Sequence, residues 1–274
     1  MDTIETIKGS VVQHGRHNDR VYVMHFGSAD TVGLVARLEA LAVEHGYGKV
    51  LAKIPAPAWP PFQSAAYCRE AVVPGFFRGS TDGLFIAKYF SVARRSAPAP
   101  KVLLEPSAHA KLSPPVRPGY RVIPCRTADA QEMASFYRRI FKTYPFPIQE
   151  PAYLARMMAA GARYFCIRLQ GRIAAIAAAE INLEHENAEM TDFATRPQWR
   201  GMGLAGLLLL RLEQSARELG MKTAYTIARA ASQPMNALFC NRGYAYAGLL
   251  KKNSQIGGRI ASMIVWHKSL GCAV

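Results

Sequence analysis

The segment Arg196–Gly206 (RPQWRGMGLAG) combines arginines with closely spaced glycines immediately before an apolar, helix-like stretch. The unpaired amides and the dipole of a helix N-terminus attract anions, and glycine lets a phosphate approach the backbone. Arg200, Gly201 and Gly203 therefore predict a phosphate-binding loop. A purely structural interpretation, in which the glycines only allow close helix–strand packing, explains Gly206 within the helix but not the cluster before it.

The same glycines satisfy the G-x-G-x-x-G pattern of dinucleotide-binding folds. That motif requires a tight strand-to-helix turn and an acidic residue about 20 positions further on. Here Arg196–Gly201 separates the preceding strand from the glycines, and no Asp or Glu follows Glu218. We therefore reject a dinucleotide site, and the lack of Gly-Lys-Ser/Thr excludes a Walker loop in the same way.

Acidic residues gather just upstream of this loop, at Glu180, Glu184, Glu186, Glu189 and Asp192. Glu184 and Glu186 fit a solvated hairpin tip, whereas the other three lie in apolar strand context. Carboxylates there could attract a cationic amine, whose ordinary pKa is about 10.4, and take its proton. Glu189 is the preferred base and Asp192 the second choice. Strand alternation places these two on opposite faces unless a bulge intervenes, and the sequence leaves that open.

The chain carries a formal net charge of +15 over 274 residues, of which residues 119–274 hold +10. An anionic partner is therefore expected: nucleic acid, a membrane surface or a phosphate-rich cofactor. No basic helix with interleaved aromatic residues is apparent, which disfavours a nucleic-acid-binding protein. No apolar stretch approaches the about 20 residues of a membrane-spanning helix, so no membrane partner is expected.

Cysteine and histidine usage points to a cytoplasmic protein without a metal. The five cysteines are widely spaced and form no Cys-x-x-Cys pair, which argues against a disulfide framework and against a thiolate zinc site. His14, His17 and His25 have no supporting carboxylate pattern, so no metal site is predicted. The acidic N-terminus does not resemble a secretory signal.

Repeated prolines predict a semi-rigid linker over residues 98–118, between an N-terminal domain (1–97) and a C-terminal domain (119–274). In the first domain we expect strands at Asp19–Phe26 and Lys49–Ile54, a helix at Ala29–His45 and a strand pair within residues 70–90. This pattern describes a small α/β unit.

The C-terminal domain is predicted to be of the α/β (α+β) class, a mixed sheet with helices on both faces. Its expected helices are Ala128–Lys142, Glu150–Ala159, Leu204–Leu219 and Ser232–Asn241. Its expected strands are Tyr120–Pro124, Arg163–Leu169, Arg172–Leu183, Ala188–Thr195, Lys222–Ala228, Tyr244–Leu250 and Ile260–Lys268. Gln170-Gly171 is typical of a tight hairpin turn.

Gln198-Trp-Arg-Gly201-Met-Gly203, followed by Leu204-Ala205, resembles the Arg/Gln-x-x-Gly-x-Gly/Ala signature of the GNAT N-acetyltransferase superfamily. The element order from Tyr120 to Lys268 also agrees with that fold. The resemblance implies acetyl-CoA as co-substrate, held by the loop, the strand before it and a second motif at Ser232–Tyr244. The implied cofactor contacts are Phe193, Ala194, Thr195, Arg200, Gly201, Met202, Gly203, Leu204, Ala205, Ser232, Asn236 and Phe239.

The second motif departs from the superfamily pattern at Phe239. Most members carry a tyrosine there, which protonates the departing CoA thiolate, and phenylalanine has no proton to give. Tyr225, Tyr244 or water would have to substitute, or the thiolate leaves unassisted. We count Tyr225 with Glu189 and Asp192 as candidate catalytic residues, and a non-catalytic acyl-CoA sensor is an alternative.

Longer segments in both domains resemble the beta-lysine N-acetyltransferases, among them Glu70–Phe77, Ala188–Thr195, Tyr225–Ala230 and Ser262–Trp266. This resemblance implies acetyl transfer to the terminal amine of beta-lysine, giving the compatible solute N-epsilon-acetyl-beta-lysine. The acidic cluster suits such a cationic diamine. The candidate substrate contacts are Tyr144, Phe146, Glu180 and Arg229, with the arginine as partner for a substrate carboxylate.

Several alternatives stay open from the sequence. The acceptor could instead be a polyamine, an antibiotic amine or a protein lysine, and the oligomeric state is undetermined, with a homodimer as one option. The strand and helix pattern of residues 19–90 echoes the second half of the C-terminal domain. We therefore expect a degenerate half-copy that stabilises the catalytic sheet and narrows the substrate cleft.

Overall fold

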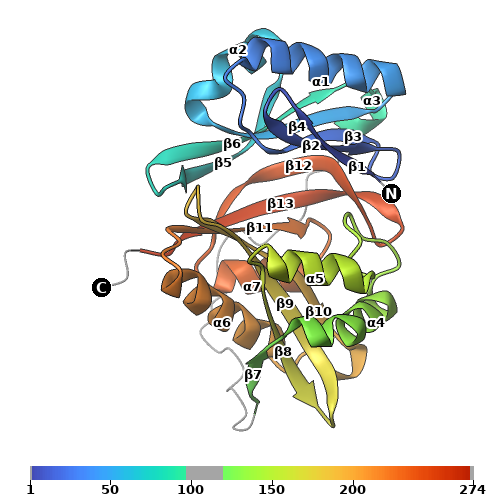
Figure 1. Cartoon of the computed structure of the whole chain (residues 1–274), viewed down its shortest axis with the longest axis vertical. Helices are drawn as coiled ribbons and strands as arrows, with labels where there is room; N and C mark the ends of the chain where they lie inside the picture. Colours follow the sequence, from blue (N-terminus) through green and yellow to red (C-terminus); the bar gives the residue numbers. More distant parts are fainter. Residues whose placement is uncertain (1, 97–119, 272–274) are drawn as a thin grey trace.

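The computed structural model describes residues 2–96 and 120–271, whose 13 strands form one mixed sheet (Figure 1). The strand order is β1-β2-β3-β4-β6-β5-β12-β13-β11-β10-β9-β8-β7. The predicted linker, residues 98–118, lies outside the described residues. Below, residues 2–96 are called the N-terminal unit and residues 120–271 the C-terminal unit.

The element bounds are as follows. The N-terminal unit contains β1 (Thr3–Ile7), β2 (Ser10–Gly15), β3 (Arg20–His25), α1 (Thr31–His45), β4 (Lys49–Pro55), α2 (Trp59–Ser64), β5 (Cys68–Phe77), β6 (Thr81–Tyr89) and α3 (Val92–Arg95). The C-terminal unit contains β7 (Val122–Pro124), α4 (Ala130–Ile140), α5 (Pro151–Ala159), β8 (Arg163–Leu169), β9 (Arg172–Asn182), β10 (Asn187–Thr195), α6 (Leu204–Glu218), β11 (Thr223–Arg229), α7 (Gln233–Asn241), β12 (Ala245–Ile256) and β13 (Arg259–Ser269).

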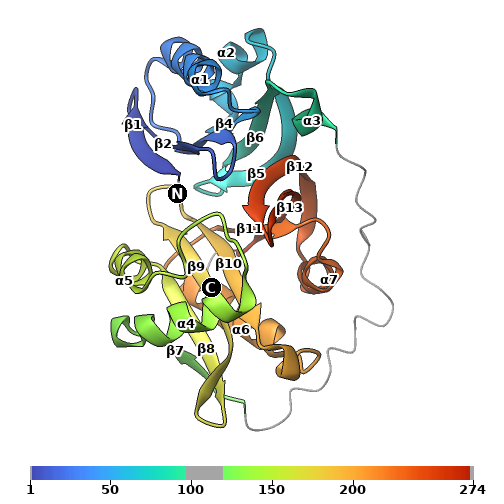
Figure 2. The ribbon, with the colours of Figure 1, turned by 90° about the vertical axis from the view of Figure 1, so that its right-hand side faces the viewer.

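Helices cover both faces of the C-terminal part of the sheet, as predicted. Along β9, Ala175, Ala177 and Ala179 pack in the same core as the apolar face of α6, whereas Ile176 and Ala178 pack in the core of α4 and α5. This division follows from the alternation of side chains along a strand. Figure 2 shows α4 and α5 on one side of β8–β10 and α6 on the other.

The N-terminal unit is covered by α1 and α2 on one face only. Val21, Val23, Val50 and Ala52 of β3 and β4 pack against these helices in one buried core. The alternate residues of the same two strands point to the opposite, helix-free face. That face is turned toward the C-terminal unit (Figure 1).

The two units share a topology. The order β1-β2-β3-β4-β6-β5 repeats the order β8-β9-β10-β11-β13-β12, and in each case the third and fourth strands are parallel and joined through one helix, α1 or α6. The units meet through equivalent strands, β5 and β12, so the sheet order is nearly palindromic. This observation supports the half-copy hypothesis and extends it to six strands.

The junction between β5 and β12 depends on one close backbone approach. Gly248 of β12 pairs with Ala71 of β5, and a Cβ at this glycine would lie 2.1 Å from the carbonyl oxygen of Glu70. Buried polar groups reinforce the junction: Lys49 Nζ donates to Glu70 Oε2 (2.6 Å) and to the carbonyl oxygen of Lys251 (2.8 Å). Since both charges are paired and hydrogen-bonded, their burial is tolerated.

Two details differ from the sequence-based prediction, and one is confirmed. The hairpin β1–β2 was not predicted, because β1 is almost wholly exposed and lacks apolar alternation. Its turn, Lys8-Gly9, has positive φ at both residues (49° and 81°), as a type I′ turn requires. Strand β12 runs on to Ile256, past a bulge after Leu250 that interrupts the pattern. The turn at Gln170-Gly171 is confirmed, since Leu169 pairs with Arg172.

Candidate functional site

The predicted phosphate loop has free amides at a helix N-terminus. Gly201 and Gly203 have φ of 77° and 74°, a region that disfavours other residues, and Gly203 is the N-cap of α6 without a side-chain cap. Within the described residues, the N–H groups of Gly201–Ala205 donate to no other backbone group. Such amides, together with the helix dipole, suit a phosphate.

Strands β10 and β11 separate next to this loop. Their parallel pairing runs from Asn187–Thr223 to Glu189–Tyr225 and stops there, although both strands continue. A pocket opens where they part, lined by Phe193 of β10 and by Thr226 and Ile227 of β11. An extended ligand can enter a sheet at such a place, because the strand edges are left without partners.

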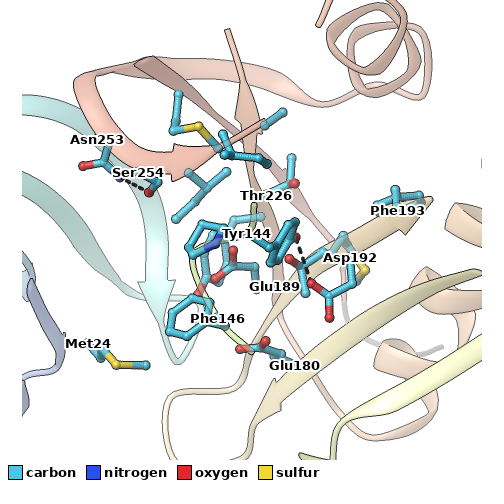
Figure 3. Close-up of a pocket in the computed structure, with 18 of the residues that line it drawn as sticks. Met24, Tyr144, Phe146, Glu180, Glu189, Asp192, Phe193, Thr226, Asn253 and Ser254 are labelled. Carbon is cyan, nitrogen blue, oxygen red and sulfur yellow. Dashed lines mark hydrogen bonds between the residues drawn. The ribbon is translucent and has the colours of Figure 1, made fainter. Parts of the chain in front are cut away.

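A cavity of about 350 Å³ extends from this opening toward the N-terminal unit. Its wall includes all three predicted carboxylates, Glu180, Glu189 and Asp192 (Figure 3). The helix-free face of the N-terminal unit supplies the opposite wall, through Arg20, Tyr22, Met24, Leu51 and Lys53. The site is therefore built from both units.

A bulge in β10 decides the placement of Asp192. The pairing with β9 shifts between Thr191 and Ala194, and Asp192 itself has φ of 55°. One extra residue reverses the alternation, so that Asp192 and Glu189 line the same cavity. The alternative that the sequence left open is thereby settled in favour of a shared face.

Two tyrosine hydroxyls hold the Asp192 carboxylate. Tyr144 Oη donates to Oδ1 (2.9 Å; Figure 3), and Tyr164 Oη donates to Oδ2 (3.1 Å). Burial raises the pKa of Asp192 to about 6, against the opposing effect of these hydrogen bonds. With both oxygens occupied by protein donors, Asp192 is suited to fixing Tyr144 more than to receiving a proton.

Glu180 and Glu189 are direct neighbours in the pairing of β9 with β10. Burial and then the Glu189 charge raise the pKa of Glu180 to about 8. Burial also raises the pKa of Glu189, but Lys53 and a hydrogen bond from Tyr225 oppose the rise. Because the two carboxyls lie side by side, ionisation of one disfavours ionisation of the other, and Lys53 and Tyr225 favour the charged form of Glu189. The choice of Glu189 as the base stays a prediction.

Lys53 is the residue that the sequence reasoning missed. It belongs to β4 of the N-terminal unit, lines the cavity and donates from Nζ to Tyr225 Oη (2.9 Å). The available signal was a lysine between the apolar residues of the predicted strand Lys49–Ile54, where a solvent-facing side chain is the usual interpretation. The helix-free face also contributes Tyr22 and Met24, which were singled out for no role.

The other predicted substrate contacts lie around the same cavity. Tyr144, Phe146 and Arg229 line it, and the segment 144–147 is held by the N-terminal unit, where His17 Nε2 lies 3.1 Å from the carbonyl oxygen of Tyr144. Asn18 Nδ2 donates to the carbonyl oxygen of Pro145 (3.4 Å). These hydrogen bonds hold the segment against the N-terminal unit.

The second predicted motif is divided between the cavity and the core. Ser232 and Phe239 line the cavity, and the Phe239 ring packs edge-on against Phe193. Asn236 is buried, and its side-chain amide bonds to the carbonyl oxygens of Arg229, Ala230 and Ser232 while accepting from Trp266 Nε1. Asn236 therefore shapes the start of α7 through protein contacts. Its direct contact with a cofactor stays a prediction.

The remaining predicted cofactor contacts continue from β10 into the loop. Ala194 is buried in the core of α4 and α5, Thr195 pairs with Ala175, and the exposed Arg200 donates from Nε to the carbonyl oxygen of Thr195 (3.3 Å). Met202 packs against the core of α6 and Leu204 is buried in it, so their backbone is the part available to a ligand. Ala205 lies in the first turn of α6.

In residues 2–96 and 120–271, no group of three His, Cys, Asp or Glu side chains is arranged to hold a metal ion. No helix in these ranges is long and apolar enough to cross a membrane.

Comparison with known proteins gives consistent matches. The profile of the acetyltransferase (GNAT) family matches residues 130–244. The chain is 30% identical over 277 residues to a beta-lysine N(6)-acetyltransferase of Methanococcus maripaludis, covering 98% of this chain and 99% of that protein. It is 28% identical over 278 residues to the N-acetyltransferase YodP of Bacillus subtilis, covering 97% and 100%. A beta-lysine N(6)-acetyltransferase of Methanosarcina mazei is 36% identical over 152 residues, 56% of each chain.

Proposed function

Because the chain belongs to the GNAT family of acetyltransferases, we propose that it transfers the acetyl group of acetyl-CoA to the terminal amine of beta-lysine or of a similar small diamine. Family membership makes it an acetyl-CoA-dependent N-acetyltransferase, and the proposal concerns the acceptor and the residues used. One observation carries it: the similarity to the Methanococcus relative spans both units, and both units line the cavity. The product would be N-epsilon-acetyl-beta-lysine, a compatible solute.

The cavity chemistry supports an acceptor that is both cationic and aliphatic. The Glu189 carboxylate attracts an ammonium group and Glu180 adds carboxyl oxygens that accept hydrogen bonds, while Met24 and Phe146 offer apolar surface for a methylene chain. A diamino acid also carries a carboxylate, for which Arg229 on the cavity wall is the candidate partner. A polyamine would have no use for that arginine, which favours the amino acid.

The donor fits the opening between β10 and β11. The free amides of Gly201–Ala205 would hold the pyrophosphate of acetyl-CoA, with Arg200 adding positive charge. The unpaired edges beyond Glu189 and Tyr225 would receive the pantetheine arm. The thioester supplies the acetyl group. The chain's own residues must supply the base and the contacts that stabilise the oxyanion.

The chemistry assigned to those residues is direct transfer within a ternary complex. Glu189 accepts a proton from the acceptor ammonium, and the free amine attacks the acetyl carbonyl carbon. The C–N bond forms, the nitrogen releases its second proton to water, the C–S bond breaks, and the backbone N–H groups near Phe193–Ala194 stabilise the oxyanion. Water protonates the thiolate, because Phe239 has no proton to give and the Tyr225 hydroxyl donates to Glu189.

The test is thiol release from acetyl-CoA by the purified chain with beta-lysine, alpha-lysine, spermidine or no acceptor. We expect turnover with beta-lysine and at least about tenfold lower kcat/KM with alpha-lysine, since a displaced amine loses its alignment with the base. Equal turnover with spermidine would contradict the amino-acid acceptor and leave the family chemistry intact. Arg229→Gln should raise the KM for beta-lysine and leave the KM for acetyl-CoA unchanged.

A further inference from the structure

Lys53 reaches the candidate site from a strand of the other unit. The alternation of β4 places Val50 and Ala52 against α1 and leaves Lys53 on the helix-free face, at the cavity wall. Its Nζ lies 2.9 Å from Tyr225 Oη and 5.2 Å from the centre of the Tyr225 ring. Phe76 provides a second aromatic face, with its centre 5.5 Å from Nζ. The ammonium is therefore held from several sides.

The contact to Tyr225 fixes a hydrogen-bond direction. The Lys53 ammonium has only donors, so the Tyr225 hydroxyl accepts from it and has a single proton left to give. Tyr225 is also hydrogen-bonded to Glu189, its neighbour in the pairing of β10 with β11. The proton of Tyr225 therefore points at the carboxylate, and the three side chains form a chain of donors that ends on Glu189.

We propose that Lys53 is a positioning residue of the acetyl-transfer site, which orients the Tyr225 hydroxyl and stabilises the charge of the Glu189 carboxylate. The inference rests on the proposed function, because it takes Glu189 as the base. It assigns the N-terminal unit a part in the chemistry: beyond covering the cleft, this unit supplies the cation that keeps the base able to accept a proton.

Among the described residues that face Glu189, Lys53 is the cationic one. The facing carboxyls are Glu180 of β9 and Asp192 of β10, and the facing tyrosines are Tyr22, Tyr144, Tyr153 and Tyr225. Burial raises the pKa of each of these tyrosines, so all four stay neutral near pH 7. Burial lowers the pKa of Lys53, and the charges of Glu189 and Glu180 oppose that change.

The decisive variant is Lys53→Met, compared with Lys53→Arg, which keeps the charge, and with Lys88→Met as a matched control. Lys88 lies on the adjacent strand β6 and pairs with Glu39 at the edge of α1, away from the cavity. Two quantities are measured: the pH dependence of kcat/KM for thiol release, and the titration of the Glu189 carboxyl by 13C NMR without substrate. Loss of the signal in Glu189→Gln identifies the resonance.

We expect Lys53→Met to move both the acidic limb of kcat/KM and the Glu189 midpoint to higher pH by about one unit or more, since an opposite charge is lost. Lys53→Arg should show at most half of that shift, and Lys88→Met should change neither quantity.

If Lys53→Met does not fold, Lys53→Gln replaces it. An unchanged Glu189 midpoint in the folded variant, or a rise in the acceptor KM alone, overturns the proposal. If no amine is turned over by the unmodified chain, the acceptor assignment fails, and the NMR titration still decides the role of Lys53.

Discussion

The helices α1 and α6 follow equivalent strands of the two units, yet their N-termini are occupied differently. At α1, Asp30 caps the helix: its Oδ1 accepts from the N–H of Gly33 (2.8 Å), and Lys8 pairs with its other oxygen (3.3 Å). At α6, Gly203 stands at the cap position and no side chain fills the site. A carboxylate of the chain thus lies at α1 where α6 can receive a phosphate from outside.

The strands before these helices differ in the same way. Both β3 and β10 contain one extra residue in the pairing with their neighbour, so the bulge is common to both units. In β10 it presents Asp192 to the cavity, and in β3 it falls at Met24, which lines the same cavity. At the bulge, one topology therefore presents a carboxylate in one unit and an apolar side chain in the other. Single residues at the bulge and at the helix N-terminus decide which of the two forms.

The largest effect is expected at Glu189, the candidate base in the C-terminal unit. Glu189→Gln should lower kcat by at least about 100-fold, because the amide cannot take the ammonium proton. Steady-state thiol release with beta-lysine measures it, and Glu184→Gln, at the exposed hairpin tip, is the matched control with unchanged kcat. Nearly full activity in Glu189→Gln would move the base to Asp192 or to water.

The second-largest effect is expected when α6 receives an aspartate at its N-cap, as α1 has. Gly203→Asp should raise the KM for acetyl-CoA by about tenfold or more, because a carboxylate would compete for the free amides and repel the pyrophosphate. Gly203→Asn is the control, since asparagine tolerates the same positive φ without the charge. Equal KM values for the two variants would attribute the change to backbone strain and contradict an anion site.

A smaller effect concerns the stability of the polar cavity. The pKa of Glu180 is raised to about 8 by burial, above its ordinary 4.5, so the folded chain keeps a proton that the unfolded chain releases. Stability from this group therefore falls as the pH rises from about 4.5 to 8. In Glu180→Gln this loss should be absent, and the difference in Tm between pH 5 and pH 8 should shrink. An identical difference in both proteins would contradict the burial of this carboxyl.

The smallest effect is expected at α1. Asp30→Ala should slightly destabilise the fold through loss of the helix cap, with the KM for acetyl-CoA unchanged. Urea unfolding and steady-state kinetics on the same preparation measure both. A raised KM for acetyl-CoA would mean that the capped helix also takes part in donor binding, and the contrast between the two N-termini would fail.

Local patterns were enough to predict much of the site. The loop from Arg200 to Ala205 is recognisable because a helix N-terminus with glycines is a local feature, set by residues within one turn of each other. Glu180 and Glu189 stood out because charges within apolar strands are costly without a purpose. The strands from β8 to β11 were predicted close to their observed bounds because each is a short apolar segment.

The sequence by itself determined the phosphate loop, the acidic strands and the mixed sheet, because each depends on neighbouring residues and on periodicity. Only the tertiary structure decided that Asp192 shares a face with Glu189, since a bulge arises from the pairing of two strands. Only the tertiary structure brought Lys53 to Tyr225, 172 positions away in the chain. Contacts of that kind depend on how two units dock, and no spacing along the chain records it.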